Sequence, residues 1–438
     1  MKREPRALEA ALADIERQDL KRVRATVESF AEPGGRVVNI AAGAAVQATG
    51  AGATGAATAT GSARSLVDFS SNDYLALSRH SGVAAAMAAS AEHWGAGSGA
   101  SHLVTGRGVE HARLEEELAE FTGRERALLF STGYMANLAV VTSLAGRGEV
   151  MLLDRLSHAS LIDAGLLSGS QFKRYAHADS AAAERALEAA SGKAAIVATD
   201  GVFSMDGDIA PLAELAQMSR AHRAWLVVDD AHGLGVVGPR GRGSLELLGL
   251  NCDDVPVLVG TLGKAFGSFG AFVAGSAELI EFLMQSARPY IYTTALPQPV
   301  AAATRAALRI AQRETWRRER VLALTERFRH AATALEVPLA ESSTPIQPVM
   351  LGSAGAAVQA QKELMDAGFW VVAIRPPTVP RGGARLRVTL SAAHTDEQVD
   401  ALAEALARVC ARVGSAAQPR GVAHAGGAPA STIEVETE

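Results

Sequence analysis

The sequence is poor in cysteine and has no excess of positive charge. Cys252 and Cys410 are the only cysteines among 438 residues, and they are too few and too far apart for a disulfide framework or a four-ligand zinc site. We therefore interpret them as two reduced thiols and expect no metal. The 42 Lys and Arg residues against 47 Asp and Glu residues give a formal net charge of −5. This balance argues against a nucleic-acid-binding protein, which typically has a basic surplus.

Long hydrophobic runs are also missing. Residues 37–63 carry no charge, but they are almost entirely Ala, Gly and Thr rather than the Leu, Ile and Phe of a membrane span. We predict that this stretch is a flexible insertion. The first residues mix charges of both signs and show no apolar segment followed by a small-residue cleavage site, so we expect neither a secretory signal nor a transit peptide. These features favour a cytoplasmic protein that does not contact a membrane.

Short apolar runs alternate with helical periodicity from about residue 110 onward. The runs are ALLF at 127, VMLL at 150, AIVA at 195, WLVV at 225, VLVG at 257 and AFVA at 271. Such alternation predicts an α/β domain with a largely parallel sheet.

The character of the chain changes on both sides of this region. We predict an N-terminal arm over 1–74, a large domain over 75–305, a small α/β domain over 306–413 and a disordered tail over 414–438. The arm should begin with a helix, because apolar residues recur on one side of it: Leu8, Leu12, Ile15, Leu20, Val23 and Val27. Thr395 followed by Gln398 predicts the capping box of a last helix.

Polar residues follow several of the predicted buried strands. Asp229 and His232 come after WLVV, Lys264 after VLVG, and Ser204 a few residues after AIVAT. Ligands of open α/β sheets bind beyond the carboxyl ends of the strands, so we expect these groups to converge on one site. Lys264 lies between small residues that would let a flat ring approach it, although an isolated Gly-Lys pair is more often a surface turn.

Two further patterns are consistent with an anionic ligand that carries a cationic ring. The run LLFSTGYMAN predicts a strand, a tight turn and a helix that begins near Tyr134, whose free amides could bind a phosphate. An ordinary turn capped by Ser131 or Thr132 gives the same pattern. Asp229 at the end of a buried strand requires a cationic partner, either a pyridinium nitrogen or a structural salt bridge.

One pattern is misleading. The segment from Gly233 to Gly238 matches G-x-G-x-x-G and follows a strand. A dinucleotide site requires a helix to open inside this pattern, but Pro239-Arg-Gly-Arg-Gly243 follows and prevents one. This context argues against a nicotinamide site here.

Several motifs in register resemble the α-oxoamine synthase family. They are SSNDYLAL at 70, STGYMAN at 131, DRLSHASLIDA at 154, DGVFSMDGDIAPL at 200, VVDDAHGLGVVGPRGRGS at 227, TLGKAFG at 261 and RPYIYTTALP at 288. The resemblance extends from about residue 6 to 412, apart from the Ala/Gly/Thr segment. It implies fold type I of the pyridoxal-phosphate enzymes, with a mostly parallel seven-stranded sheet, and a homodimer whose active sites lie at the subunit interface.

The resemblance also implies a role for each matching residue. Pyridoxal 5'-phosphate would be held by Lys264 through a Schiff base, Asp229 would pair with the ring nitrogen and His158 would stack on the ring. Ser204 and His232 would bond the ring hydroxyl oxygen. The phosphate would be bound by the amides of Gly133 and Tyr134, by Thr261, and by Thr293 or Thr294 of the other subunit. The substrate would be contacted by His158, Arg375, which would bind the carboxylate of alanine, Arg22 and Thr378.

Two motifs narrow the implied reaction. DDAHGLGVVG at 229 and IRPPTVPRGGARLRVTLSAAHT at 374 resemble family members that condense L-alanine with a pimeloyl thioester and release carbon dioxide, in biotin biosynthesis. The acyl carrier, coenzyme A or a carrier protein, stays open. Three alternatives also stay open: a related acyltransferase that uses glycine or serine, a binding protein that kept the site without turnover, and a nicotinamide dehydrogenase.

Overall fold

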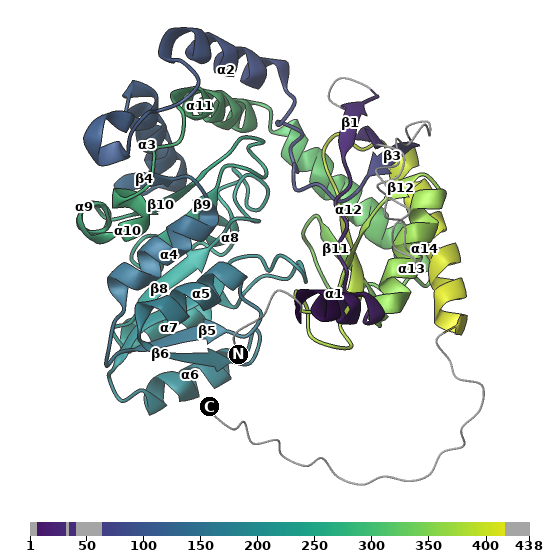
Figure 1. Ribbon diagram of the computed structural model, residues 1–438. Coiled ribbons are helices and arrows are strands. Elements are labelled where there is room, and N and C mark those ends of the chain that lie inside the picture. The colour runs from purple at the N-terminus through teal and green to yellow at the C-terminus, as the bar shows by residue number, and fades with distance from the viewer. Residues whose placement is uncertain (1–6, 32–34, 41–63, 417–438) are drawn as a thin grey trace.

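The computed structural model describes residues 7–31, 35–40 and 64–416, and Figure 1 shows their arrangement. A seven-stranded sheet forms the centre of the larger part. Its strands, in spatial order, are β4 (Arg126–Phe130), β10 (Ala271–Gly275), β9 (Val257–Thr261), β8 (Trp225–Asp229), β7 (Ala194–Asp200), β5 (Val150–Asp154) and β6 (Gln171–Tyr175). Only β10 runs antiparallel to its neighbours, so the prediction of a mostly parallel sheet is confirmed.

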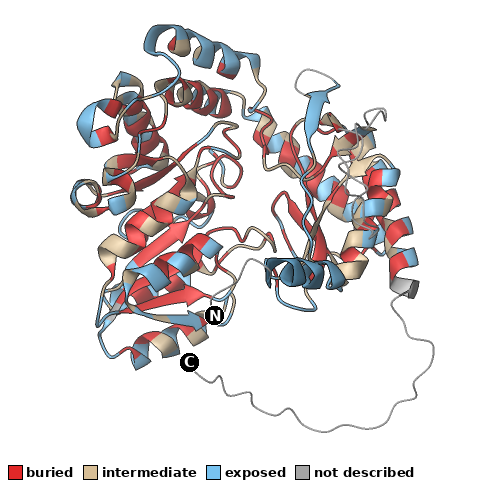
Figure 2. Ribbon diagram, in the orientation of Figure 1, coloured by how far each residue is buried: buried red, intermediate tan, exposed pale blue. Residues whose placement is uncertain are grey.

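Apart from the edge strand β6, the strands of this sheet are buried on both faces, as Figure 2 shows. Met151 and Leu153 of β5 pack under α4 (Gly133–Leu144), α5 (Ala159–Ser168) and α9 (Ala277–Ser286). The alternate residues Val150 and Leu152 pack toward α6 (Ser180–Ala189) and α7 (Leu212–Ala221). Successive side chains of a strand point to opposite faces, so a sheet covered by helices on both sides requires the continuous apolar runs seen in the sequence.

Further helices flank the β4 edge of the sheet. They are α2 (Ser81–Trp94), the π-helix η1 (His102–Gly106), α3 (Val109–Thr122), α10 (Arg288–Ile291) and α11 (Gln298–Arg313), and the short α8 (Ser244–Leu247) follows β8. No helix among the described residues is both long and apolar enough to cross a membrane.

In the described residues, the smaller part contains two sheets packed with the helices of the C-terminal segment. β11 (Ile346–Gly352), β14 (Ala384–Thr389) and β13 (Val372–Ile374) form an antiparallel sheet. The other sheet joins N-terminal strands β1 (Val27–Phe30), β2 (Val37–Ile40) and β3 (Arg64–Asp68) to β12 (Phe369–Trp370). The helices are α12 (Trp316–Ala334), α13 (Ala354–Asp366) and α14 (Asp396–Ala416). The N-terminal strands therefore belong spatially with the C-terminal elements (Figure 1).

The structure corrects three predictions near the ends of the chain. The arm helix α1 (Ala7–Arg17) ends early, so Leu20 and Val23 lie beyond it, and Val27 begins a strand. Residues 37–40 form β2 rather than part of an insertion, because Val38 and Ile40 are buried beside β3. α14 continues to Ala416, past the predicted start of the tail. Residues 41–63 and 417–438 lie outside the described residues.

The predicted capping box is confirmed. The Thr395 hydroxyl accepts a hydrogen bond from the Gln398 amide at 3.2 Å, and the Gln398 side chain accepts one from the Thr395 amide at 3.1 Å.

Candidate functional site

The candidate site lies where β7, β8 and β9 end. Asp200 and Asp229 are Cα partners at the last positions of the parallel strands β7 and β8, and Thr261 ends β9. The turn after β8 carries His232, and the turn after β9 carries Lys264. The structure thus brings together the groups that the sequence analysis expected at one edge of the sheet.

Lys264 and His232 form the centre of the site. The Lys264 ammonium nitrogen lies 2.9 Å from Nε2 of His232, and the other ring nitrogen, Nδ1, lies 2.7 Å from the Tyr74 hydroxyl. Burial lowers the pKa of Lys264 to about 8, although the nearby Asp229 carboxylate acts in the opposite direction. A lysine with this pKa is partly neutral near physiological pH and can act as a nucleophile or a base.

Asp229 and Asp200 are two buried carboxyl groups in contact with neutral donors. Asp229 accepts hydrogen bonds from the Asn137 side chain at 2.6 Å and from the Ala231 amide at 3.1 Å. Asp200 accepts one from the His158 amide at 2.9 Å, and burial followed by the charge of Asp229 raises the pKa of Asp200 well above its usual value. Within the described part of the chain, no ion pair within 4.0 Å satisfies either carboxyl. Two buried carboxyl groups without an ion-pair partner favour a cationic ligand.

His158 caps the helix that follows β5. Its Nδ1 lies 2.7 Å from the Ser160 hydroxyl, and the same hydroxyl accepts a hydrogen bond from Asn137 at 2.8 Å. Asn137 thereby links His158 to Asp229. His158 is exposed, so its ring is oriented by these contacts and remains accessible to a planar ligand.

The N-terminus of α4 offers an anion site. Thr132 caps the helix through the Met135 amide, and the amides of Gly133 and Tyr134 have no acceptor among the described residues. A Cβ added at Gly133 would meet no atom within 4 Å, so the space beside these amides is open. Thr261 donates its hydroxyl proton to the Gly270 carbonyl at 3.2 Å. Two free amides at the positive end of a helix suit a phosphate.

The sequence analysis assigned no role to Arg387, Asn72 and Tyr74, which the structure places here. Arg387 on β14 donates to the Ser204 carbonyl at 2.6 Å and to the Asn72 side chain at 3.0 Å, while its buried Nη2 has no partner. Tyr74 contacts His232. The available signals were the motif SSNDYLAL, which contains Asn72 and Tyr74, and the unusual pair of arginines in the apolar run ARLRVTL. Tyr74 and both arginines are buried in the structure.

The proposed substrate residues lie on the arm and on the loop after β13. Arg22 donates to the Thr378 hydroxyl at 3.4 Å, so these two are brought together. Arg375 donates to the backbone carbonyls of Asp19 at 2.6 Å and Lys21 at 2.5 Å. No hydrogen bond within the described chain joins Thr293 or Thr294 to the Lys264 group; Thr294 is exposed and bridges Ser101.

The glycines after β8 surround a carboxylate. A Cβ at Gly233 or Gly243 would lie 2.1 and 1.9 Å from the oxygens of buried Asp230. No helix opens between Gly233 and Gly238, and the next helix, α8, starts at Ser244. The G-x-G-x-x-G match is therefore a turn that encloses Asp230.

Comparison with known proteins places this geometry in a family. Residues 64–406 match the model for aminotransferase class I and II. The chain belongs to this family. Its curated relatives include an 8-amino-7-oxononanoate synthase from Methylococcus capsulatus, at 60% identity over 341 residues (78% of this chain, 88% of the relative). In Saccharophagus degradans the identity is 54% over 353 residues (81% of this chain, 89% of the relative).

Solved structures agree with this placement. A serine palmitoyltransferase from S. paucimobilis with a bound PLP–myriocin aldimine superposes with a TM-score of 0.83 at 28% identity, covering 93% of this chain and 98% of that one. An 8-amino-7-oxononanoate synthase from Francisella tularensis gives a TM-score of 0.70 at 31% identity, covering 80% of this chain and 98% of that one. The fold is thus that of the fold type I transferases.

Proposed function

We propose that this chain is an 8-amino-7-oxononanoate synthase that condenses L-alanine with a pimeloyl thioester and releases carbon dioxide. The family and the identity to the curated synthases support this proposal. The structural observation that carries it is Lys264, which lies 2.9 Å from His232 beside the buried carboxyls of Asp229 and Asp200. This constellation suits a lysine that forms a Schiff base and later moves a proton.

The site fits pyridoxal phosphate. In the described residues, Asp229 has no cationic partner and the amides of Gly133 and Tyr134 have no acceptor. The exposed His158 ring is oriented by its contact with the Ser160 hydroxyl. These groups would hold the ring nitrogen, the phosphate and the ring face respectively, while Ser204 and His232 would bond the ring oxygen and Thr261 the phosphate. When bound, this cofactor withdraws electrons from the carbon next to the substrate nitrogen.

The chain's own residues would then handle protons and position the substrate. Asp229 would hold the protonated ring nitrogen, since a buried carboxylate with neutral donors stabilises a cation beside it. Lys264 would accept the Cα proton of alanine at Nζ, for which a pKa of about 8 is well matched to neutral pH. His232 remains within hydrogen-bond distance of Nζ and keeps the amine oriented.

Two arginines are proposed to bind carboxylates. Arg375 was assigned to the alanine carboxylate by resemblance, but two of its N–H groups are occupied by arm carbonyls. Arg387 has a buried Nη2 without a partner, and an unpaired buried donor of this kind is stabilised by an anion. We therefore add Arg387 to the proposed carboxylate ligands.

The arm is proposed to receive the acyl thioester. Arg22 contacts Thr378, and exposed Arg17, Lys21 and Arg24 lie on the same segment. Positive charge at this position suits the phosphates of coenzyme A or the acidic surface of a carrier protein. We further propose a cytoplasmic homodimer in which Thr293 or Thr294 reaches the partner's phosphate site.

The test is the mass of the product. Alanine with pimeloyl-CoA should yield 8-amino-7-oxononanoate, with one carbon dioxide and one free thiol for each product molecule. Glycine or serine with acetyl-CoA or palmitoyl-CoA should react far more slowly. Faster turnover with glycine or serine and one of these two thioesters would replace the proposal by another α-oxoamine synthase. No turnover with any combination of amino acid and thioester would leave a binding protein.

A further inference from the structure

We propose that Tyr74 is a positioning residue: its hydroxyl holds His232 so that Nε2 can accept a hydrogen bond from the Lys264 ammonium group. Arg36 anchors the segment that carries Tyr74. The proposal rests on the proposed function only in that Lys264 is taken to bind pyridoxal phosphate. Its physical basis is the chain of contacts from Arg36 to Lys264.

Tyr74 and His232 form a buried pair beside Arg387. The tyrosine side chain is 1% exposed and His232 is 7% exposed, and the hydroxyl lies 2.7 Å from Nδ1. Burial lowers the pKa of His232 well below its usual value, and the neighbouring Lys264 and Arg387 charges add to this effect. The ring is therefore neutral, and only one of its two nitrogens carries a proton.

The hydroxyl can serve either tautomer of this ring. When the Lys264 ammonium donates to Nε2, Nδ1 carries the proton and donates to the Tyr74 oxygen, and the hydroxyl hydrogen can turn toward Asn72 Oδ1 at 3.4 Å. When the lysine nitrogen is neutral, Nε2 carries the proton and the hydroxyl donates to Nδ1 instead. A phenylalanine could do neither, and it would leave a buried ring nitrogen unpaired.

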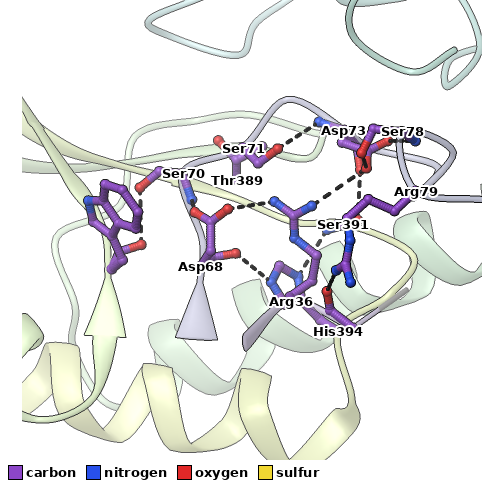
Figure 3. Close-up of polar contacts among 12 residues, drawn as sticks. Arg36, Asp68, Ser70, Ser71, Asp73, Ser78, Arg79, Thr389, Ser391 and His394 are labelled. Carbon is purple, nitrogen blue, oxygen red and sulfur yellow. Dashed lines mark hydrogen bonds and ion pairs between the residues drawn. The ribbon is translucent and has the colours of Figure 1, made fainter. Parts of the chain in front are cut away.

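Arg36 anchors the segment that carries Tyr74, and Figure 3 shows its contacts with Asp68 and Asp73. Its guanidinium is buried and pairs with Asp68 at 2.6 Å and with Asp73 at 3.6 Å, the residue before Tyr74. Asp73 also accepts hydrogen bonds from the Leu77 amide and the Ser78 hydroxyl, at 2.9 and 2.6 Å.

The loop after β14 holds the same segment from the other side. The Ser391 hydroxyl donates to the Asp73 carbonyl at 2.7 Å, and the Ala392 amide donates to the Tyr74 carbonyl at 2.8 Å. His394 Nε2 lies 2.9 Å from the Asp68 carbonyl (Figure 3). Backbone contacts on both sides of Tyr74 thus fix the place of its hydroxyl relative to His232.

The test measures Lys264 without any acyl substrate. Full-length protein freed of cofactor is mixed with pyridoxal phosphate at pH 6 to 10, and the rate of appearance of the visible absorbance is plotted against pH. The wild-type rate should have its inflection near pH 8, set by burial and by the charges of Asp229, Arg387, Asp200 and Asp230. Tyr74→Phe should move the inflection down by about half a pH unit or more, because the edge of a phenyl ring offers no acceptor to Nδ1–H and so disfavours the tautomer whose Nε2 accepts from the ammonium group.

The controls separate positioning from general damage. Tyr175→Phe removes a buried hydroxyl in a different core cluster and should leave the inflection in place. Arg36→Met should shift it in the same direction as Tyr74→Phe. In a His232→Asn background, Tyr74→Phe should cause no further shift. An inflection within 0.2 pH unit of wild type in folded Tyr74→Phe overturns the proposal. If that variant does not fold, an unchanged inflection in Arg36→Met does so.

The outcome is independent of the acyl substrate. Failure to condense alanine with pimeloyl-CoA would remove the proposed function and leave the shift of the inflection intact.

Discussion

Asp200 and Asp229 lie directly opposite each other at the ends of two neighbouring parallel strands, and both are buried. The two carboxyls are not equivalent, because Asp200 has a pKa raised well above its usual value by burial and by the charge of Asp229. Asp200 accepts a hydrogen bond from the His158 amide. Asp229 is held by the Asn137 side chain, and it is the carboxyl that the proposed function assigns to the ring nitrogen.

Neutralising each carboxyl should have unequal effects. We expect Asp229→Asn to lower kcat with alanine and pimeloyl-CoA by about 100-fold or more, since an amide cannot hold the proton of a pyridinium nitrogen. Asp200→Asn should lower it by less than about 10-fold, because an amide oxygen still accepts from His158. Steady-state kinetics of the two variants decide this. Equal losses would contradict the division of roles.

Replacing Lys264 should abolish the visible absorbance of the cofactor-loaded protein. Lys264→Ala lacks the amine that bonds to the cofactor, so neither the absorbance nor its loss on borohydride reduction should remain, and kcat should fall by about 1,000-fold or more. Absorbance spectra before and after borohydride provide the measurement. Lys193→Ala, on the loop before β7, is a matched control that should keep the spectrum. Retention of absorbance in the Lys264 variant would show that another residue holds the cofactor.

The two candidate carboxylate ligands can be distinguished by kinetics. If the unpaired Nη2 of Arg387 binds alanine, Arg387→Met should lower kcat/KM for alanine by about 10- to 100-fold. Arg375 binds the Asp19 and Lys21 carbonyls of the arm, so Arg375→Met should act mainly by loosening the arm and should raise KM for the acyl thioester. The opposite pattern would return the alanine carboxylate to Arg375.

His177 should make the free energy of unfolding depend on alkaline pH. Its ring nitrogens each lie 3.0 Å from a carboxylate, of Asp154 and of Asp208. Burial alone would lower its pKa, but these two bonds outweigh burial and raise the pKa to about 10. The stabilisation is complete below about pH 6.5, the ordinary pKa, and is lost as pH rises through about 10.

Urea unfolding at pH 6.5 and pH 10 tests this expectation. Wild type should lose at least ~1 kcal/mol more than His177→Gln between the two pH values. The same loss in both proteins would assign the alkaline sensitivity to other groups.

The glycine turn after β8 should tolerate no side chain at Gly243. This residue has a φ of +89°, and a Cβ there would lie 1.9 Å from an Asp230 oxygen. We expect Gly243→Ala to cost about 2 to 4 kcal/mol of the free energy of unfolding. Gly249→Ala, with a φ of +68° and open space around it, should cost only about 1 kcal/mol. Equal costs would show that backbone strain alone, and not the clash, limits the turn.

Much of the large sheet could be predicted because its strands are buried on both faces. All six apolar runs became strands of that sheet. The strand that sequence analysis missed, β6 (Gln171–Tyr175), lies at the edge of the sheet and exposes Lys173 and Arg174, so its pattern is polar. The arm was predicted less well. Val27 fits the helical spacing but pairs with Ile40 in a sheet, because tertiary pairing overrides a weak periodicity.

By itself, the sequence determined which residues follow buried strands. It therefore placed Lys264, Asp229, His232 and Ser204 near the carboxyl ends of the strands of the large sheet. Only the tertiary structure decided what surrounds them. Tyr74 reaches His232 across 158 positions, and Arg387 reaches Asn72 across 315. Periodicity and local motifs report neighbours along the chain, whereas these contacts arise when the N-terminal strands join the small sheets and bring distant loops to the end of the large one.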